Sequence, residues 1–196
     1  RMPGQNRFSQ RQGKINNIDL ALSLGEAVLA RHPANAELRS IMGGLYFNLK
    51  EYDKAIRAYQ TIIKMDPENQ VAYLYLATIY VQEKKYDEAE KAYRKMLDID
   101  PDNIIGMFYY AKMLVQANRF TEAEALYQKI ITQRPAFEAA WLGLAALYET
   151  QKKYDEAIDV YRRHLEMMPA RHNLRIKIAE LLVRANRQGD AEKEFL

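Results

Sequence analysis

The sequence predicts an all-α fold made of repeated pairs of antiparallel helices. Five of the six prolines, at positions 33, 67, 101, 135 and 169, are spaced 34 residues apart. A fixed period of this length is typical of repeat architectures. Between the prolines, apolar residues recur at the spacing of a helical face. The period and the spacing together predict a solenoid of helix–turn–helix units.

The proline period divides the chain into segments when each proline is taken as position 32 of a 34-residue unit. Residues 1–16 are basic and polar, and we expect a poorly ordered leader or a degenerate helix there. The segments that follow are a half repeat that holds only a second helix (17–35), four repeats (36–69, 70–103, 104–137 and 138–171) and an incomplete repeat (172–196).

Each unit is predicted to hold two helices, as residues 70–103 illustrate. Four apolar residues of its first half stand at i, i+3, i+4 and i+7: Tyr73, Leu76, Ala77 and Tyr80. A second stripe begins at Tyr86, and Asp87 is the expected N-cap. Pro101 ends this second helix, because proline lacks the N–H that would continue the helical hydrogen bonds.

Several positions keep one residue type from unit to unit. Position 20 is always alanine: Ala21, Ala55, Ala89, Ala123, Ala157 and Ala191. Position 8 is small: Gly43, Ala77, Ala111, Ala145 and Ala179. Position 24 is a large aromatic residue in five units: Tyr59, Tyr93, Tyr127, Tyr161 and Phe195. Small residues let paired helices approach closely, and we expect the rings to fill the space between hairpins.

These positions, with the proline at position 32 and Trp141 at position 4, resemble the tetratricopeptide repeat (TPR) family over residues 17–196. The resemblance implies a right-handed superhelix in which the first helix of each unit lines a concave face. The chain departs from the family pattern where Arg39 and Arg175 occupy position 4. It departs again in the half repeat, where Gly25 replaces the position-24 aromatic.

The two ends of the array are expected to be uncapped. Each repeat of a solenoid buries its apolar face only on a neighbour, so arrays normally close with a polar cap. Ile178, Leu182 and Phe195 are therefore expected to face no neighbour within this segment. We expect either a longer array or self-association through the uncapped ends.

The composition argues against catalytic, metal-binding and membrane-spanning roles. The chain has no cysteine, which excludes disulfides and thiolate sites. It carries none of the usual enzyme motifs, and its three scattered histidines form no metal site; His164 stands at a core position. No apolar run approaches the roughly 20 residues that span a bilayer. We therefore predict no enzyme activity, no metal, no cofactor and a soluble chain without a signal segment, whose compartment the sequence leaves open.

The surface that the resemblance assigns to the concave groove is apolar and aromatic. The predicted partner-binding residues are Val71, Leu74, Tyr75, Thr78, Ile105, Phe108, Tyr109, Lys112 and Leu142. Exposed apolar patches usually mark interaction sites, and aromatic anchors flanked by polar groups suit a peptide or an amphipathic helix. We therefore predict a protein–protein interaction scaffold. Packing between adjacent first helices is an equal alternative for Leu74, Phe108 and Leu142.

Two other functions stay open. The array can select a substrate or organise an assembly for a catalytic or envelope domain outside this segment. It can also bind single-stranded RNA, since related helical repeats do so. RNA is the weaker alternative, because the formal net charge is only +3 and the groove offers little positive charge beyond Lys112, Lys177 and Arg184.

Overall fold

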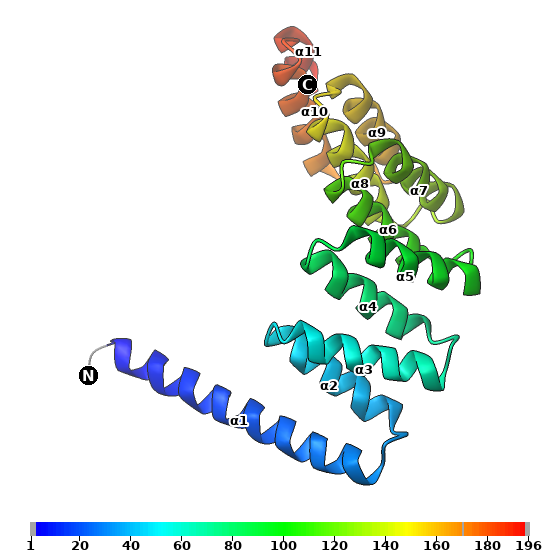
Figure 1. The fold of residues 1–196 in the computed structure, drawn as a ribbon. Coiled ribbons are helices and arrows are strands. Elements are labelled where there is room, and N and C mark those ends of the chain that lie inside the picture. The colour runs from blue at the N-terminus through cyan, green and yellow to red at the C-terminus, as the bar shows by residue number, and fades with distance from the viewer. Residues whose placement is uncertain (1–2, 170, 195–196) are drawn as a thin grey trace. The chain divides into compact units, whose positions relative to one another are not determined.

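The computed structural model describes residues 3–169 and 171–194, with side chains from residue 17 onward (Figure 1). These residues form eleven α-helices and no strand. They divide into two compact units, Arg1–Ile99 and Asp100–Leu196. The predicted all-α helical repeat fold is confirmed.

The first unit contains five helices: α1 (Pro3–Arg31), α2 (Ala36–Asn48), α3 (Tyr52–Met65), α4 (Gln70–Gln82) and α5 (Tyr86–Ile99). Within this unit, each helix packs on the one that follows it, from α1 on α2 to α4 on α5. The core between α2 and α3 depends on a small residue at position 8. A Cβ added to Gly43 would lie only 2.9 Å from the ring of Tyr59, so the two helices approach closely because Gly43 has no side chain.

The second unit contains six helices: α6 (Ile104–Gln116), α7 (Phe120–Gln133), α8 (Glu138–Thr150), α9 (Tyr154–Met167), α10 (His172–Arg184) and α11 (Gln188–Lys193). Consecutive helices again pack together, and α6 also contacts α8. The helix starts agree with the 34-residue period, since α2, α4, α6, α8 and α10 begin where the units were expected to begin. The division into repeat domains itself stays a prediction.

The residues that keep one type from unit to unit form the core, as expected. The buried alanines at position 20 are Ala55, Ala89, Ala123, Ala157 and Ala191. The buried rings at position 24 are Tyr59, Tyr93, Tyr127 and Tyr161. Phe195 lies outside the described residues. Burying an aromatic ring removes a large apolar area from water, so these rings stabilise the contacts between hairpins.

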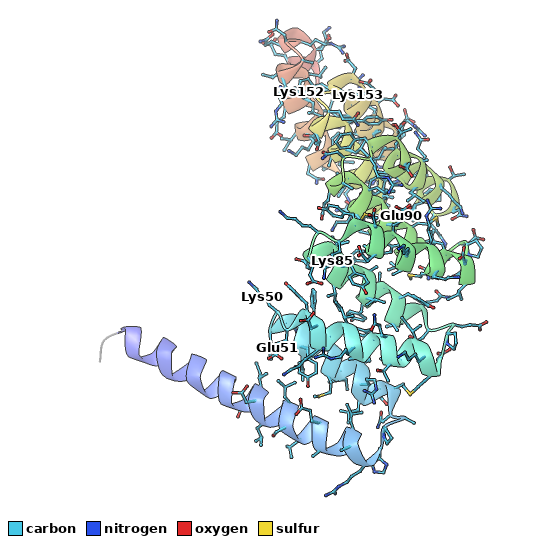
Figure 2. All side chains as sticks on the ribbon, in the orientation of Figure 1. Lys50, Glu51, Lys85, Glu90, Lys152 and Lys153 are labelled. Atoms are coloured by element: carbon cyan, nitrogen blue, oxygen red, sulfur yellow. The ribbon has the colours of Figure 1, made fainter. Side chains whose placement is uncertain are left out.

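The ends of the first helices use signals that the sequence analysis did not single out. Asn69 caps α4, because its side-chain oxygen accepts a hydrogen bond of 3.0 Å from the N–H of Ala72. Among the described residues, five that are not glycine adopt a positive φ, each at position 15 of its unit: Lys50, Lys84, Asn118, Lys152 and Asn186. The N–H of the next residue then bonds back to the helix, as Lys85 does to the Tyr80 carbonyl at 2.9 Å. Lys50 and Lys152 lie at the tips of their hairpins (Figure 2).

Three expectations were wrong. Asp87 is not an N-cap, because α5 begins at Tyr86 and Asp87 lies inside its first turn. Ala21 is exposed, unlike the other position-20 alanines, because in the structure no first helix of the same hairpin packs on that face of α1. Ile178 and Leu182 do not face an empty end, since both are fully buried. They lie on α10, which packs between α9 and α11.

The start of the chain also differs from a half repeat. Residues 3–16 belong to α1, so of the two alternatives for the leader the structure has a helix. This helix continues without a break through residues 17–31. It has 29 residues, whereas the second helices α3, α5, α7 and α9 have 14 each.

Candidate functional site

A cleft of about 450 Å³ opens in the second unit between α6 and α8. The residues that line it come from α6 (Phe108, Lys112, Val115 and Gln116), α7 (Tyr127) and α8 (Ala139, Leu142, Gly143, Ala146, Leu147 and Thr150). Most of them are apolar. Lys112, Gln116 and Thr150 are the polar exceptions beside the phenol of Tyr127. Residues from two first helices, α6 and α8, therefore line the same cleft.

Phe108 is the central residue of the α6 wall. Its ring is half-buried and lies edge-on to Tyr109 at 5.5 Å, to Phe137 at 5.5 Å and to Tyr127 at 6.2 Å between centroids. Edge-to-face pairs at these distances are favourable beyond their buried area. The ring is therefore held in place by its neighbours while part of it stays open to the cleft.

Lys112 supplies positive charge at the cleft. Its Nζ lies 5.7 Å from the ring centroids of both Phe108 and Tyr109. A cation over aromatic faces is attracted by about 0.5–1 kcal/mol at an exposed site. The side chain is exposed, so the ammonium group can also meet a carboxylate of a bound molecule.

The α8 wall combines two large apolar residues, Leu142 and Leu147, with three small ones. Leu142 is 39% exposed, and Ala139, Gly143 and Ala146 leave room beside it. A Cβ on Gly143 would lie 2.6 Å from Tyr127 Cε1, so glycine lets α8 approach the ring. Burial raises the pKa of Tyr127 to about 12, which keeps this phenol neutral at ordinary pH.

The predicted residues of the first unit lie on α4. Tyr75 is 41% exposed and stacks on the buried Tyr59 at 5.0 Å with nearly parallel rings. Val71 is exposed, and Leu74 and Thr78 are half-buried. The Thr78 hydroxyl donates to the Leu74 carbonyl at 2.8 Å, so its proton is already used.

Within the second unit, four of the predicted residues lie on two different clefts. Phe108, Lys112 and Leu142 line the α6–α8 cleft. Ile105 lies instead on a second cleft of about 530 Å³, with Asp100, Asp102, Arg134 and Phe137 among its walls. None of the nine predicted partner-binding residues is fully buried. Their role in partner binding stays a prediction.

The sequence analysis missed a cleft of about 530 Å³ in the first unit. Its walls come from α1, α2 and α3 and include Arg39 and Tyr46. The Tyr46 hydroxyl donates to Glu26 Oε1 at 2.5 Å, and burial, followed by this carboxylate, raises the pKa of Tyr46 to about 12. Arg39 donates to the Pro33 carbonyl at 2.7 Å. The sequence signal that could have indicated this cleft is Arg39, which departs from the repeat pattern at position 4.

His164 is a packed side chain, as its core position predicted. It is fully buried and stacks on Trp141 at 5.5 Å with the rings 3° apart. Neither ring nitrogen has a hydrogen-bond partner in the described part of the chain. Burial lowers the pKa of His164; Glu138 opposes this shift and Arg171 adds to it. The described residues contain no cluster of three metal-binding side chains.

The part of the chain that the structure describes has no helix with the length and apolarity needed to cross a membrane.

Comparison with known proteins identifies the repeat type. The family described as "Cytochrome c-type biogenesis protein H TPR domain" matches residues 61–175. The family described as "Anaphase-promoting complex, cyclosome, subunit 3" matches residues 14–96. No curated protein matches the sequence.

Solved structures show the same fold at low sequence identity. A tetratricopeptide repeat protein from Parabacteroides merdae has a TM-score of 0.72 and 19% identity, over 96% of this chain and 75% of its own. The MamA protein has a TM-score of 0.66 and 20% identity, over 82% of this chain and 87% of its own. YrrB, described as a TPR protein with an unusual peptide-binding site, has a TM-score of 0.63 and 16% identity, over 87% and 88%.

Proposed function

Because the chain belongs to the family of cytochrome c-type biogenesis protein H TPR domains, within the tetratricopeptide repeats, we propose that it is a protein-interaction scaffold whose α6–α8 cleft binds an apolar segment of a partner. The observation that carries the proposal is the cleft itself. Phe108 and Leu142 present partly exposed apolar surface from two neighbouring first helices. Such surface usually marks an interaction site.

The chemistry of the cleft favours a partner segment that combines apolar and acidic residues. A volume of about 450 Å³ can take one or two large side chains. Lys112 stands beside this apolar surface, where its charge would meet a carboxylate on the same segment. An amphipathic helix presents apolar residues at i, i+3 and i+4 with acidic residues beside them, so it matches both features.

The α4 surface is proposed as a second contact area, within the first unit. Tyr75 offers an exposed ring whose inner face rests on Tyr59. A ring that is already immobilised loses little conformational freedom when a partner covers it. Val71 and Leu74 extend the apolar surface beside Tyr75 on the same helix.

The test selects peptides from a displayed library of random 15-residue sequences on the purified chain. We expect enrichment of peptides with apolar residues at helical spacing and nearby acidic residues, and loss of their binding to Leu142→Glu by tenfold or more. Ile176→Glu is the matched control, because Ile176 is also an exposed aliphatic residue, on α10 and 51% exposed. Equal binding to wild type and Leu142→Glu would contradict the proposal.

RNA binding is disfavoured by the pairing of basic side chains. Lys177 Nζ lies 2.9 Å from Glu180 Oε2, and Arg184 lies 3.6 Å from Glu149 Oε2. A salt titration separates the two functions, because RNA affinity falls steeply with salt whereas an apolar contact responds weakly. The absence of enzyme activity stays a prediction.

An assembly role, in which the array serves a domain outside this segment, remains the second candidate. One family description names cytochrome c-type biogenesis, and the other names a subunit of the anaphase-promoting complex. Binding of a selected peptide is compatible with this role, so the two candidates differ in the partner and not in the mechanism.

A further inference from the structure

The first helix of the structure has one covered face and one open face. Helix α1 packs on α2 through Leu22 and Gly25, which are buried, and a Cβ on Gly25 would collide with the Met42 side chain. We call the exposed residues Ala21, Leu24 and Val28 the open face of α1. Leu24 is 58% and Val28 is 42% exposed.

The same positions are covered in every other unit. Residues at positions 23 and 27 of the second helices are buried or half-buried: Ala58 and Ile62, Ala92 and Met96, Leu126 and Ile130, Val160 and His164. His164 shows what covers position 27, because it stacks on Trp141 of the first helix of its own hairpin. The open face of α1 is therefore the face that a first helix of the same hairpin would cover.

The sequence before the open face carries the features of such a first helix. Phe8 stands at position 7, which is occupied by a buried large residue in each later unit: Met42, Leu76, Tyr110, Leu144 and Ile178. Ser9 stands at position 8, which is always small. Asn16 stands at position 15, where the later units turn with a positive φ. Asparagine tolerates this left-handed conformation better than most residues.

The remaining residues of this segment suit a helix that buries a single apolar side chain. Apart from Phe8, residues 4–14 are polar, basic or glycine, so a helix that buries Phe8 would present a hydrophilic outer surface. In the straight α1, Phe8 lies about 24 Å along the axis from Leu24 at about 1.5 Å per residue. The two side chains therefore meet only if the helix bends between them.

We infer that residues 3–15 dock on the open face of α1 by a turn at Asn16, forming a helical hairpin in exchange with the straight helix. Closure removes Leu24 and Val28 from water and places Phe8 in the core position of its repeat. The occupant of the open face is thus a segment of the same chain. The inference is independent of the proposed peptide cleft, which belongs to α6–α8.

The experiment measures the distance between spin labels at Asn6→Cys and Ala27→Cys by double electron–electron resonance. The chain has no native cysteine, so only these two sites are labelled. In the straight helix the sites lie about 32 Å apart at about 1.5 Å per residue. In the hairpin they face each other across packed helices about 8–10 Å apart at their axes, and the label distance falls below about 20 Å.

We expect a short-distance population that grows in Asn16→Gly and disappears in Phe8→Glu. Gln10→Glu is the control, because position 9 does not belong to the core pattern, and it should keep the short distance. A single distance near 32 Å in every variant would overturn the inference. Loss of the short distance on dilution with unlabelled chain would also overturn it, because the occupant would then be a second copy.

Discussion

Tyrosine serves opposite purposes at different positions of the repeat. Tyr59 and Tyr127, on second helices, are buried between helices. Tyr75 and Tyr109, on the first helices α4 and α6, are 41% and 39% exposed. The residue type is the same, and the position in the repeat decides whether the ring builds the framework or remains available for contact.

The largest expected difference is in stability. Tyr93→Ala should lower the free energy of unfolding by about 3–5 kcal/mol, because the ring is buried and its removal leaves a cavity. Tyr109→Ala should lower it by less than about 1 kcal/mol, since its ring is partly in water already. Urea denaturation measures both. Equal losses of unfolding free energy in the two variants would contradict the distinction between buried rings that stabilise the fold and exposed rings that remain available for contact.

A second expected effect is a loss of stability at acidic pH. His164 is buried with a lowered pKa, so the folded chain prefers neutral imidazole more strongly than the unfolded chain does. Stability is therefore fully present above the unfolded pKa of about 6.5 and falls as the pH drops below it, by at most about 1.4 kcal/mol per pH unit. His164→Leu should flatten this fall in thermal denaturation at pH 7, 6 and 5. The control is His172→Leu, an exposed histidine on α10, which should leave the slope unchanged.

The smallest expected effect is at Lys112. Lys112→Met keeps the apolar stem and removes the charge, so affinity for a selected acidic peptide should fall about two- to fivefold, as for an exposed ionic contact of about 0.5–1 kcal/mol. Fluorescence polarisation at low and high salt measures the loss. Lys152→Met, at a hairpin tip, is the control. An unchanged affinity and salt response would show that Lys112 does not meet the peptide.

The framework could be predicted from sequence because its residues recur. Alanine at position 20 and tyrosine at position 24 repeat from unit to unit, and repetition reveals their packing role. The cleft could be predicted only in part. Phe108, Lys112 and Leu142 were found, whereas the contribution of Tyr127 depends on how closely Gly143 lets α8 approach, which is a property of the packed helices.

The start of the chain shows the limit of a periodic pattern. The pattern predicted that paired helices approach closely at Ala21, but the structure places no first helix of the same hairpin there, so the side chain is exposed. Likewise the pattern gave no warning that Ile178 and Leu182 are covered by the packing of α10 with its neighbours. Burial at the ends of an array depends on which neighbours are docked, and a repeat pattern does not contain that information.

The most direct test of the peptide site is a map of backbone amide shifts by NMR when a selected peptide is titrated into the labelled chain. We expect the largest changes along α6 and α8, around Phe108, Lys112 and Leu142, and small changes on α9 and α10. Peptide binding that leaves the amides of α6 and α8 unchanged, with its largest shifts elsewhere, would contradict the assignment of the cleft as the partner-binding site.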